Sequence, residues 1–251
     1  MSFYQILFSP TGGTKKAADL IMGELTDQWE VVDISRVDEP RPFRPEDICV
    51  VAVPSFGGRV PKLAEDRLRH LRGFGARAVF VVSYGNRAYD DTLLELKNIL
   101  GDVGFQCCAA VAAVTEHSIV RKYGAGRPDK QDEDKLKAFG AEIRRVLESG
   151  EVPRDLQVPG NRTYKSRGTV LVRPKTGPKC NGCQICAREC PAGAIKLNDP
   201  RETSLVRCIG CMRCVQVCPK DARIVGKLSM LFADRALEKA CGTRKEPELF
   251  L

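Results

Sequence analysis

Eight cysteines within forty residues constrain this chain more than any other feature of its sequence. They form two runs with the same C-x-x-C-x-x-C-x-x-x-C-P spacing, and the second run lies 28 positions after the first. The same offset relates Gly182 to Gly210 and Ala194 to Ala222, which indicates an internal duplication. The first run is Cys180, Cys183, Cys186 and Cys190, and the second is Cys208, Cys211, Cys214 and Cys218.

Thiolates spaced by two residues on a short winding loop can converge on three corners of an iron-sulfur cube. The fourth corner needs a cysteine from further away, and in two-cluster ferredoxins the other motif supplies it. We call this exchange of the fourth ligand between the two motifs the crossing. It assigns Cys180, Cys183, Cys186 and Cys218 to cluster one. It assigns Cys208, Cys211, Cys214 and Cys190 to cluster two.

Two other uses of these cysteines were weighed. Structural zinc takes four ligands, and two C-x-x-C pairs could supply them, but zinc does not explain the third cysteine or the trailing C-P in both copies. A disulfide framework needs an oxidising compartment, and the chain shows no export signal. The segment at about residues 175 to 228 instead resembles bacterial-type ferredoxins with two 4Fe-4S clusters.

The charge of the chain is divided unevenly between its two parts. Residues 1 to 157 carry 22 Lys and Arg against 24 Asp and Glu, a net −2, whereas residues 158 to 251 carry 18 against 8, a net +10. Part of this excess is counter-charge for anionic clusters, and the rest is suited to steering an acidic redox partner. Nucleic acid is the weaker interpretation, because no recognised binding motif accompanies the charge. No apolar run reaches the length of a membrane span, and a reducing cytoplasm is expected.

The first 150 residues alternate short apolar runs with helical patterns. Such alternation predicts a doubly wound α/β fold with a five-stranded parallel sheet in the order 2-1-3-4-5. The expected strands are 4–8, 29–33, 48–53, 76–83 and 106–114. One expected helix begins near Lys15, and three more cover 61–71, 91–103 and 132–148.

Three loops at the carboxyl ends of these strands carry residues suited to a flat, phosphorylated ligand. The first is a glycine-rich turn before a helix, which presents backbone N–H groups to a phosphate. The other two each carry an aromatic residue, and two aromatics above one phosphate site can sandwich a ring. The candidate residues are Ser9, Thr11, Gly12, Gly13, Thr14 and Lys15; Ser55, Phe56, Gly57, Gly58 and Arg59; Tyr84, Gly85, Asn86, Arg87 and Tyr89; and His117 after the fifth strand.

With these loops, the first 150 residues resemble flavodoxins, which bind FMN. The resemblance implies that Ser9, Thr11, Gly12 and Thr14 bind the phosphate. It also implies that Phe56 and Tyr89 stack on the flavin, and that the Gly57 peptide turns toward it.

This chain departs from the flavodoxin pattern near the expected ring. Asn86 stands where an acidic residue is common, and Arg59 and Arg87 lie in the same two loops. Positive charge there would favour the reduced, anionic flavin, unless the two arginines are solvated and point away. His117 either handles a proton near the flavin or is a hydrogen-bonded loop residue.

The sequence divides into four regions. We expect a flavodoxin-like domain at 1–150, a linker at 151–174, a two-cluster ferredoxin-like domain at 175–228, and a helix with an apolar tail at 229–251. The order resembles that of flavodoxin-ferredoxin fusion proteins. This resemblance implies an electron carrier that relays single electrons between two 4Fe-4S clusters, FMN and a protein partner. An FMN-dependent reductase acting on a small anionic substrate is the alternative, and a zinc-bound interaction module is the third.

Overall fold

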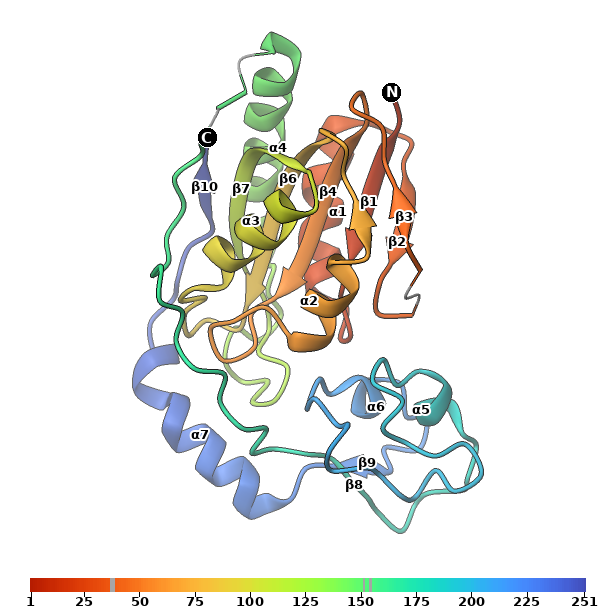
Figure 1. The fold of residues 1–251 in the computed structure, drawn as a ribbon. Coiled ribbons are helices and arrows are strands. Elements are labelled where there is room, and N and C mark those ends of the chain that lie inside the picture. The colour runs from red at the N-terminus through yellow and green to blue at the C-terminus, as the bar shows by residue number, and fades with distance from the viewer. Residues whose placement is uncertain (37–38, 151, 154) are drawn as a thin grey trace.

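The computed structural model describes residues 1–36, 39–150, 152–153 and 155–251, so residues 151 and 154 of the expected linker lie outside the described part. Its centre is a twisted sheet in the order β10-β7-β6-β4-β1-β2 (Figure 1). Neighbouring strands from β2 to β7 are parallel, which confirms the predicted five-stranded order. These strands are β1 (Phe3–Leu7), β2 (Glu30–Asp33), β4 (Ile48–Pro54), β6 (Arg77–Tyr84) and β7 (Gln106–Val114).

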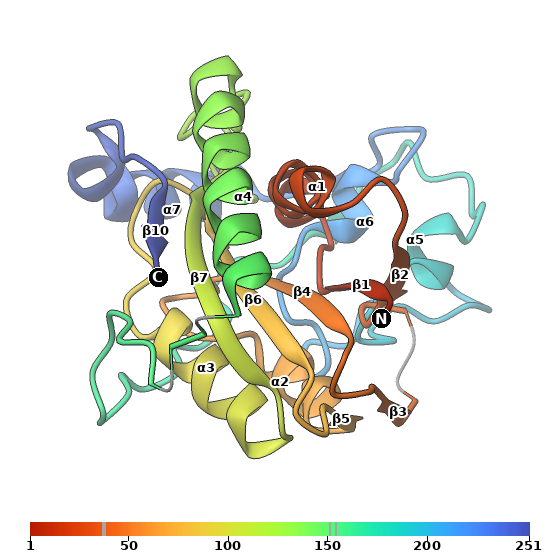
Figure 2. The ribbon, with the colours of Figure 1, turned by 90° about the horizontal axis from the view of Figure 1, so that it is seen from above.

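Helices cover both faces of the sheet (Figure 2). Helices α1 (Gly13–Leu25) and α4 (Lys130–Ser149) lie on one face, and α2 (Lys62–Leu68) and α3 (Thr92–Asp102) lie on the other. Alternate residues of β4 enter different cores: Val51 packs toward α2 and α3, and Val50 packs toward α1 and α4. The strands are apolar on both sides for this reason.

The chain ends in a strand that the sequence did not predict. β10 (Glu248–Phe250) pairs antiparallel with β7, so the sheet is six-stranded over the described residues. Helix α7 (Lys227–Cys241) leads into it and packs against the loop after β7 through Met230, Ala233 and Leu237. Two short strands, β3 (Arg41–Pro42) and β5 (Leu71–Arg72), form a separate parallel pair that was also not expected.

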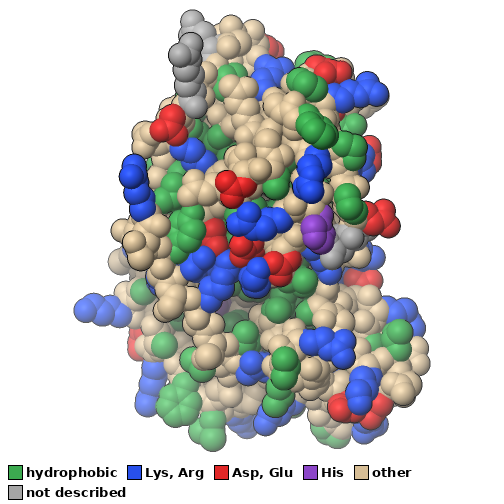
Figure 3. Space-filling view, in the orientation of Figure 1, with side chains coloured by type: hydrophobic (Ala, Val, Ile, Leu, Met, Phe, Trp, Pro, Cys, Tyr) green, Lys and Arg blue, Asp and Glu red, His purple; other side chains and the backbone are tan. Residues whose placement is uncertain are grey.

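The segment from 155 to 174 is held along the α/β domain by side-chain contacts. Asp91 is 1% exposed and accepts hydrogen bonds from the backbone N–H groups of Asn161 and Lys165, at 2.9 and 2.7 Å. Arg167 pairs with Glu95 at 2.6 Å. Basic and acidic side chains are interleaved on this side of the molecule (Figure 3). The expected linker therefore lies against the domain over its described residues.

The cysteine-rich segment lies below the carboxyl ends of the parallel strands (Figure 1). Its duplication is visible in the backbone: helices α5 (Ile185–Arg188) and α6 (Arg213–Gln216) are 28 residues apart, as are the left-handed residues Gln184 and Met212 that precede them. A small antiparallel pair, β8 (Lys175–Thr176) with β9 (Arg223–Ile224), closes the segment. Within the described residues, no helix combines the length and apolar character needed to cross a membrane.

Candidate functional site

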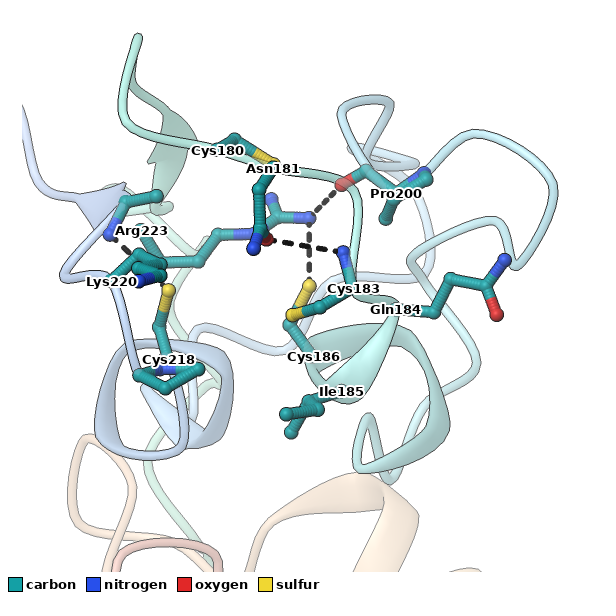
Figure 4. Close-up of a pocket in the computed structure, with 12 residues that line it drawn as sticks. Cys180, Asn181, Cys183, Gln184, Ile185, Cys186, Pro200, Cys218, Lys220 and Arg223 are labelled. Atoms are coloured by element: carbon teal, nitrogen blue, oxygen red, sulfur yellow. Dashed lines mark hydrogen bonds between the residues drawn. The ribbon is translucent and has the colours of Figure 1, made fainter.

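Four cysteines surround a cavity with an empty volume of about 330 Å³ in the cysteine-rich segment. Figure 4 shows them on two separate stretches of chain, with Arg223 extending between them. They are Cys180, Cys183, Cys186 and Cys218, so the structure brings together the first three cysteines of one run and the last of the other. This grouping is the one that the crossing predicts for cluster one, although ligation itself stays a prediction.

A second cavity, with an empty volume of about 370 Å³, is lined by the remaining cysteines of the two runs. These are Cys190, Cys208, Cys211 and Cys214, the set predicted for cluster two. Within the described residues, no three His, Cys, Asp or Glu side chains are placed to hold a single metal ion.

Hydrogen bonds to the sulfur atoms repeat between the two cavities. The N–H of Ala194 donates to Cys190 Sγ at 3.3 Å, and the N–H of Ala222 donates to Cys218 Sγ at 3.2 Å. Arg223, which is 3% exposed, also donates from Nη2 to Cys186 Sγ at 3.4 Å. Such bonds stabilise negative charge on sulfur and are one of the levers that set cluster potentials.

The free thiols differ in acidity. Burial raises the pKa of Cys211 and of Cys214 to about 12. Burial also acts on Cys218, but hydrogen bonds from three backbone N–H groups outweigh it and lower the pKa of that thiol. Because iron binds thiolates, a cluster held by Cys211 and Cys214 would form with release of their protons.

The glycine-rich turn between β1 and α1 is arranged to accept an anion. Gly12, with φ 90°, precedes the first turn of α1 and has no side chain to cap it, whereas the N–H of Lys15 donates to Ser9 Oγ at 2.9 Å. Among the described residues, the backbone N–H groups of Thr11, Gly13 and Thr14 have no hydrogen-bond acceptor. Free N–H groups at a helix N-terminus favour a phosphate. The residues present therefore fit the phosphate of a flavin nucleotide.

A cavity with an empty volume of about 460 Å³ lies beside this turn, at the carboxyl ends of β4, β6 and β7. Thr11 and Thr14 line it at one end, and Phe56, Gly85 and His117 line it further along. One residue of the cysteine-rich segment, Cys211, also lines this cavity. A candidate ligand of cluster two thus forms part of the wall of the predicted flavin site.

The tautomer of His117 follows from its hydrogen bonds. Its Nδ1 accepts the backbone N–H groups of Ile119 at 3.2 Å and Val120 at 3.0 Å, so the ring proton lies on Nε2. Burial, and then the positive charge of Arg87, lower the pKa of His117 below its usual value of 6.5. Near neutral pH, His117 is therefore a neutral N–H donor at the cavity wall.

Several predicted residues lie elsewhere. Arg59 forms a bidentate pair with the buried Glu95, and Arg87 pairs with Asp90. Tyr89 is 8% exposed and donates from its hydroxyl to Glu248 of β10 at 3.1 Å. These residues, with Asn86, Gly57 and Gly58, are not among those that line the cavity, and their roles toward FMN stay predictions.

The remaining predicted residues line two different hollows beside the glycine-rich turn. Ser55, Tyr84 and Gly13 line the cavity described above. Ser9, Gly12 and Lys15 line another hollow next to the same turn. The predicted site residues did not include several others that line the cavity: Pro10, Pro54, Ser83, Thr115, Glu116, Ser118 and Cys211. Ser118 directly follows His117, so the loop after β7 was the signal for it.

Comparisons with known proteins found similarities for the cysteine-rich segment and for the α/β domain. Residues 179–223 match the family model described as a 4Fe-4S dicluster domain. The chain thus combines a sheet with the flavodoxin-like strand order and a segment that matches a 4Fe-4S dicluster domain. No curated protein matches the chain. The findings support an electron-transfer or redox role.

Solved structures similar to the chain include flavodoxins. Flavodoxin 1 from Bacillus cereus is 19% identical, with a TM-score of 0.39, and the match covers 58% of this chain and 98% of that chain. A Fusobacterium nucleatum flavodoxin variant bound to flavin mononucleotide is 15% identical, with a TM-score of 0.35, and covers 61% and 96%. An NADH:FMN oxidoreductase in its apo form is 15% identical, with a TM-score of 0.40, and covers 61% and 91%.

Proposed function

We propose that the chain is an electron-transfer protein that relays single electrons between two 4Fe-4S clusters and FMN, and on to a protein redox partner. The observation that carries this proposal is the position of Cys211. It lines the cavity of the predicted cluster two and also the cavity beside the glycine-rich turn. One residue is thus shared by the two candidate sites, so charge would cross a short, protein-filled gap.

The residues of the α/β domain have separate tasks in this proposal. The N–H groups of Thr11, Gly13 and Thr14 hold the phosphate, and Phe56 offers a ring face to the flavin. When bound, FMN can hold one or two electrons and each cluster one, so the set can split or collect electron pairs. His117 presents its Nε2–H at the same wall.

The surroundings of cluster one suggest where a partner would approach. Arg188 and Arg201 are exposed and donate to the carbonyl oxygens of Cys183 and Cys180, at 3.0 and 2.9 Å. Lys220 is also exposed and lines the same cavity. A basic rim attracts an acidic protein and raises its rate of encounter in a salt-dependent way. We therefore assign the entry or exit of electrons to cluster one.

An anaerobic preparation tests the proposal directly. Iron, sulfide and flavin analysis should give two four-iron clusters and one FMN per chain. After rapid mixing with a one-electron reductant, cluster bleaching should precede flavin bleaching. A preparation in which reduced clusters leave the flavin oxidised would contradict the relay.

A second function is favoured by one observation, the state of His117. Its Nε2–H has no partner among the described residues, so it could bind an anionic substrate beside the flavin. In that case the chain would be an FMN-dependent reductase supplied by the clusters. Turnover of small acceptors without any partner protein, lost in His117→Ala, would favour the reductase.

A further inference from the structure

The cavity beside the glycine-rich turn is built from two distant parts of the chain. Its lining comes from loops of the α/β domain, with the exception of Cys211 from the second cysteine run. The second aromatic expected on the flavin, Tyr89, is not among the residues that line this cavity, and its ring packs against that of Tyr84, with centroids 5.2 Å apart. The cysteine loop therefore contributes a wall to the flavin site that the α/β domain alone does not provide.

Contacts on both sides of Cys211 join this loop to the α/β domain. Ile209 packs against the core formed by α2, α3 and the sheet. Arg213 donates from Nη1 to the carbonyl oxygen of Pro10, in the glycine-rich turn, at 3.2 Å. Nearby, Arg67 donates from Nη2 to the carbonyl oxygen of Pro191 at 2.8 Å. The position of the loop is thus set against the same turn that would hold the phosphate.

The conformation of this loop is one that a free chain seldom adopts. Gly210 has φ 65° and Met212 has φ 62°, and the left-handed region is unfavourable for a residue with a side chain such as Met. Cys208, Cys211 and Cys214 alternate with these two residues. A cluster bound by the three thiolates would hold the backbone in this shape, because each ligand fixes one point of the loop.

We propose that cluster two is a structural part of the flavin site, so that its occupancy and the binding of FMN are thermodynamically coupled. The inference rests on the proposed cofactors and goes beyond the relay, because it concerns binding and not electron flow. Coupling between two sites is reciprocal: if the cluster raises the affinity for FMN, FMN stabilises the cluster by the same factor.

The test compares the dissociation constant of FMN between variants under anaerobic conditions, with quenching of flavin fluorescence as the readout. Cys214→Ala removes a ligand of cluster two that does not line the flavin cavity, and Cys183→Ala is the matched change at cluster one. Iron analysis identifies which preparations retain one cluster. We expect Cys214→Ala to weaken FMN binding roughly 5- to 150-fold, the usual range of coupling between sites. Cys183→Ala should stay within about twofold of wild type, since none of the described residues that line the cavity of cluster one also lines the flavin cavity.

A second variant is designed to keep both clusters and to remove the hydrogen bond between the cysteine loop and the glycine-rich turn. Arg213→Gln removes the donor to Pro10, and Arg207→Gln, at an exposed arginine of the same segment, controls for the loss of charge. Arg213→Gln should weaken FMN binding with iron content unchanged, and Arg207→Gln should not. In wild type, saturating FMN should slow the loss of iron from cluster two to a chelator.

The outcomes separate the coupling from the relay. Equal dissociation constants for wild type, Cys214→Ala and Arg213→Gln would overturn the coupling and leave the relay intact. Weakened binding in both variants, together with a wild-type flavin that clusters never reduce, would support the coupling and overturn the relay.

Discussion

The guanidinium of Arg213 and the carbonyl oxygen of Pro10 are 3.2 Å apart, although 203 residues separate them in sequence. One belongs to the second cysteine run and the other to the turn before α1. Arg213 also binds Glu189, which in turn pairs with Arg36 at 2.7 Å. This chain of contacts fixes the second cysteine run against the carboxyl edge of the sheet.

Phe56 and Tyr89 should differ in their effect on flavin binding. Phe56 lines the cavity, whereas Tyr89 is buried beside β10. We expect Phe56→Leu to raise the dissociation constant of FMN roughly two- to twelvefold, which corresponds to the loss of an aromatic contact of about 0.5–1.5 kcal/mol. Tyr89→Leu, the matched change, should leave the dissociation constant of FMN within about twofold of the wild-type value. Titration by flavin fluorescence measures both, and a larger effect of Tyr89→Leu would restore the predicted stacking role.

Asn86 should matter for stability through the C-terminal segment. Its side-chain amide donates to the carbonyl oxygens of Cys241 and Thr243, at 2.8 and 2.9 Å, and its oxygen accepts from Arg127 and the Lys245 N–H. Asn86→Ala should lower the free energy of unfolding by about 3 kcal/mol, because buried partners lose their hydrogen bonds.

The backbone of Asn86 provides the control. Its φ is 61°, which glycine tolerates better than alanine. Asn86→Gly should therefore be about 1 kcal/mol more stable than Asn86→Ala. Denaturant unfolding measures both, and two variants indistinguishable from wild type would show that the C-terminal segment is held by other contacts.

The pH dependence of stability should report on His117. Burial and the nearby Arg87 hold its folded pKa below the ordinary value of 6.5. Below pH 6.5 the unfolded chain therefore binds more protons than the folded chain, so stability falls with decreasing pH until the folded pKa is reached. In His117→Asn the amide oxygen can still accept the N–H groups of Ile119 and Val120, but it does not titrate. We expect a shallower loss of unfolding free energy in this variant between pH 7.5 and 5.5; parallel curves would contradict the shift.

Arg223 should influence cluster one more than cluster two, because it donates a hydrogen bond to Cys186, whereas only its charge reaches Cys214. It donates to Cys186 Sγ from a buried position, and the equivalent residue in the first run, at the same offset, is Ile195. Removing the charge in Arg223→Gln should make the reduced, more negative cluster less favourable. We expect its midpoint potential to fall by about 60 mV, the equivalent of a tenfold change for one electron.

The Arg223 prediction can be checked by redox titration monitored by electron paramagnetic resonance. The potential of cluster two is measured in the same sample for comparison, and we expect it to fall by less than that of cluster one. Equal shifts of both potentials would indicate a general change in the segment, and an unchanged cluster one would show that the contact with Cys186 has no electrostatic role.

The sequence predicted those features that local patterns determine. The apolar runs from β1 to β7 show that both faces of the sheet are covered, and the offset between the cysteine runs gives the crossed grouping around the two cavities. The turn between Ser9 and Thr14 was recognisable because glycines and hydroxyls precede a helical pattern.

Contacts between distant segments could not be predicted in this way. Glu248–Phe250 is too short to show a strand period, and its pairing depends on the edge of β7 being available. The stacking of Tyr89 on the flavin stays a prediction, and its loop gave no sign that Glu248 of that late strand accepts a hydrogen bond from its hydroxyl. Arg59 similarly meets Glu95 of α3, a partner that no local pattern reveals.

The pairing of β10 with β7 also bears on how the protein is made. Synthesis runs from the N-terminus, so both cysteine runs leave the ribosome before Glu248–Phe250 can cover the edge of β7. During that interval the nascent sheet has an open edge, which is a site for wrong pairing with other chains. Closure of this edge would therefore be among the last steps of folding, after both cysteine runs have been synthesised.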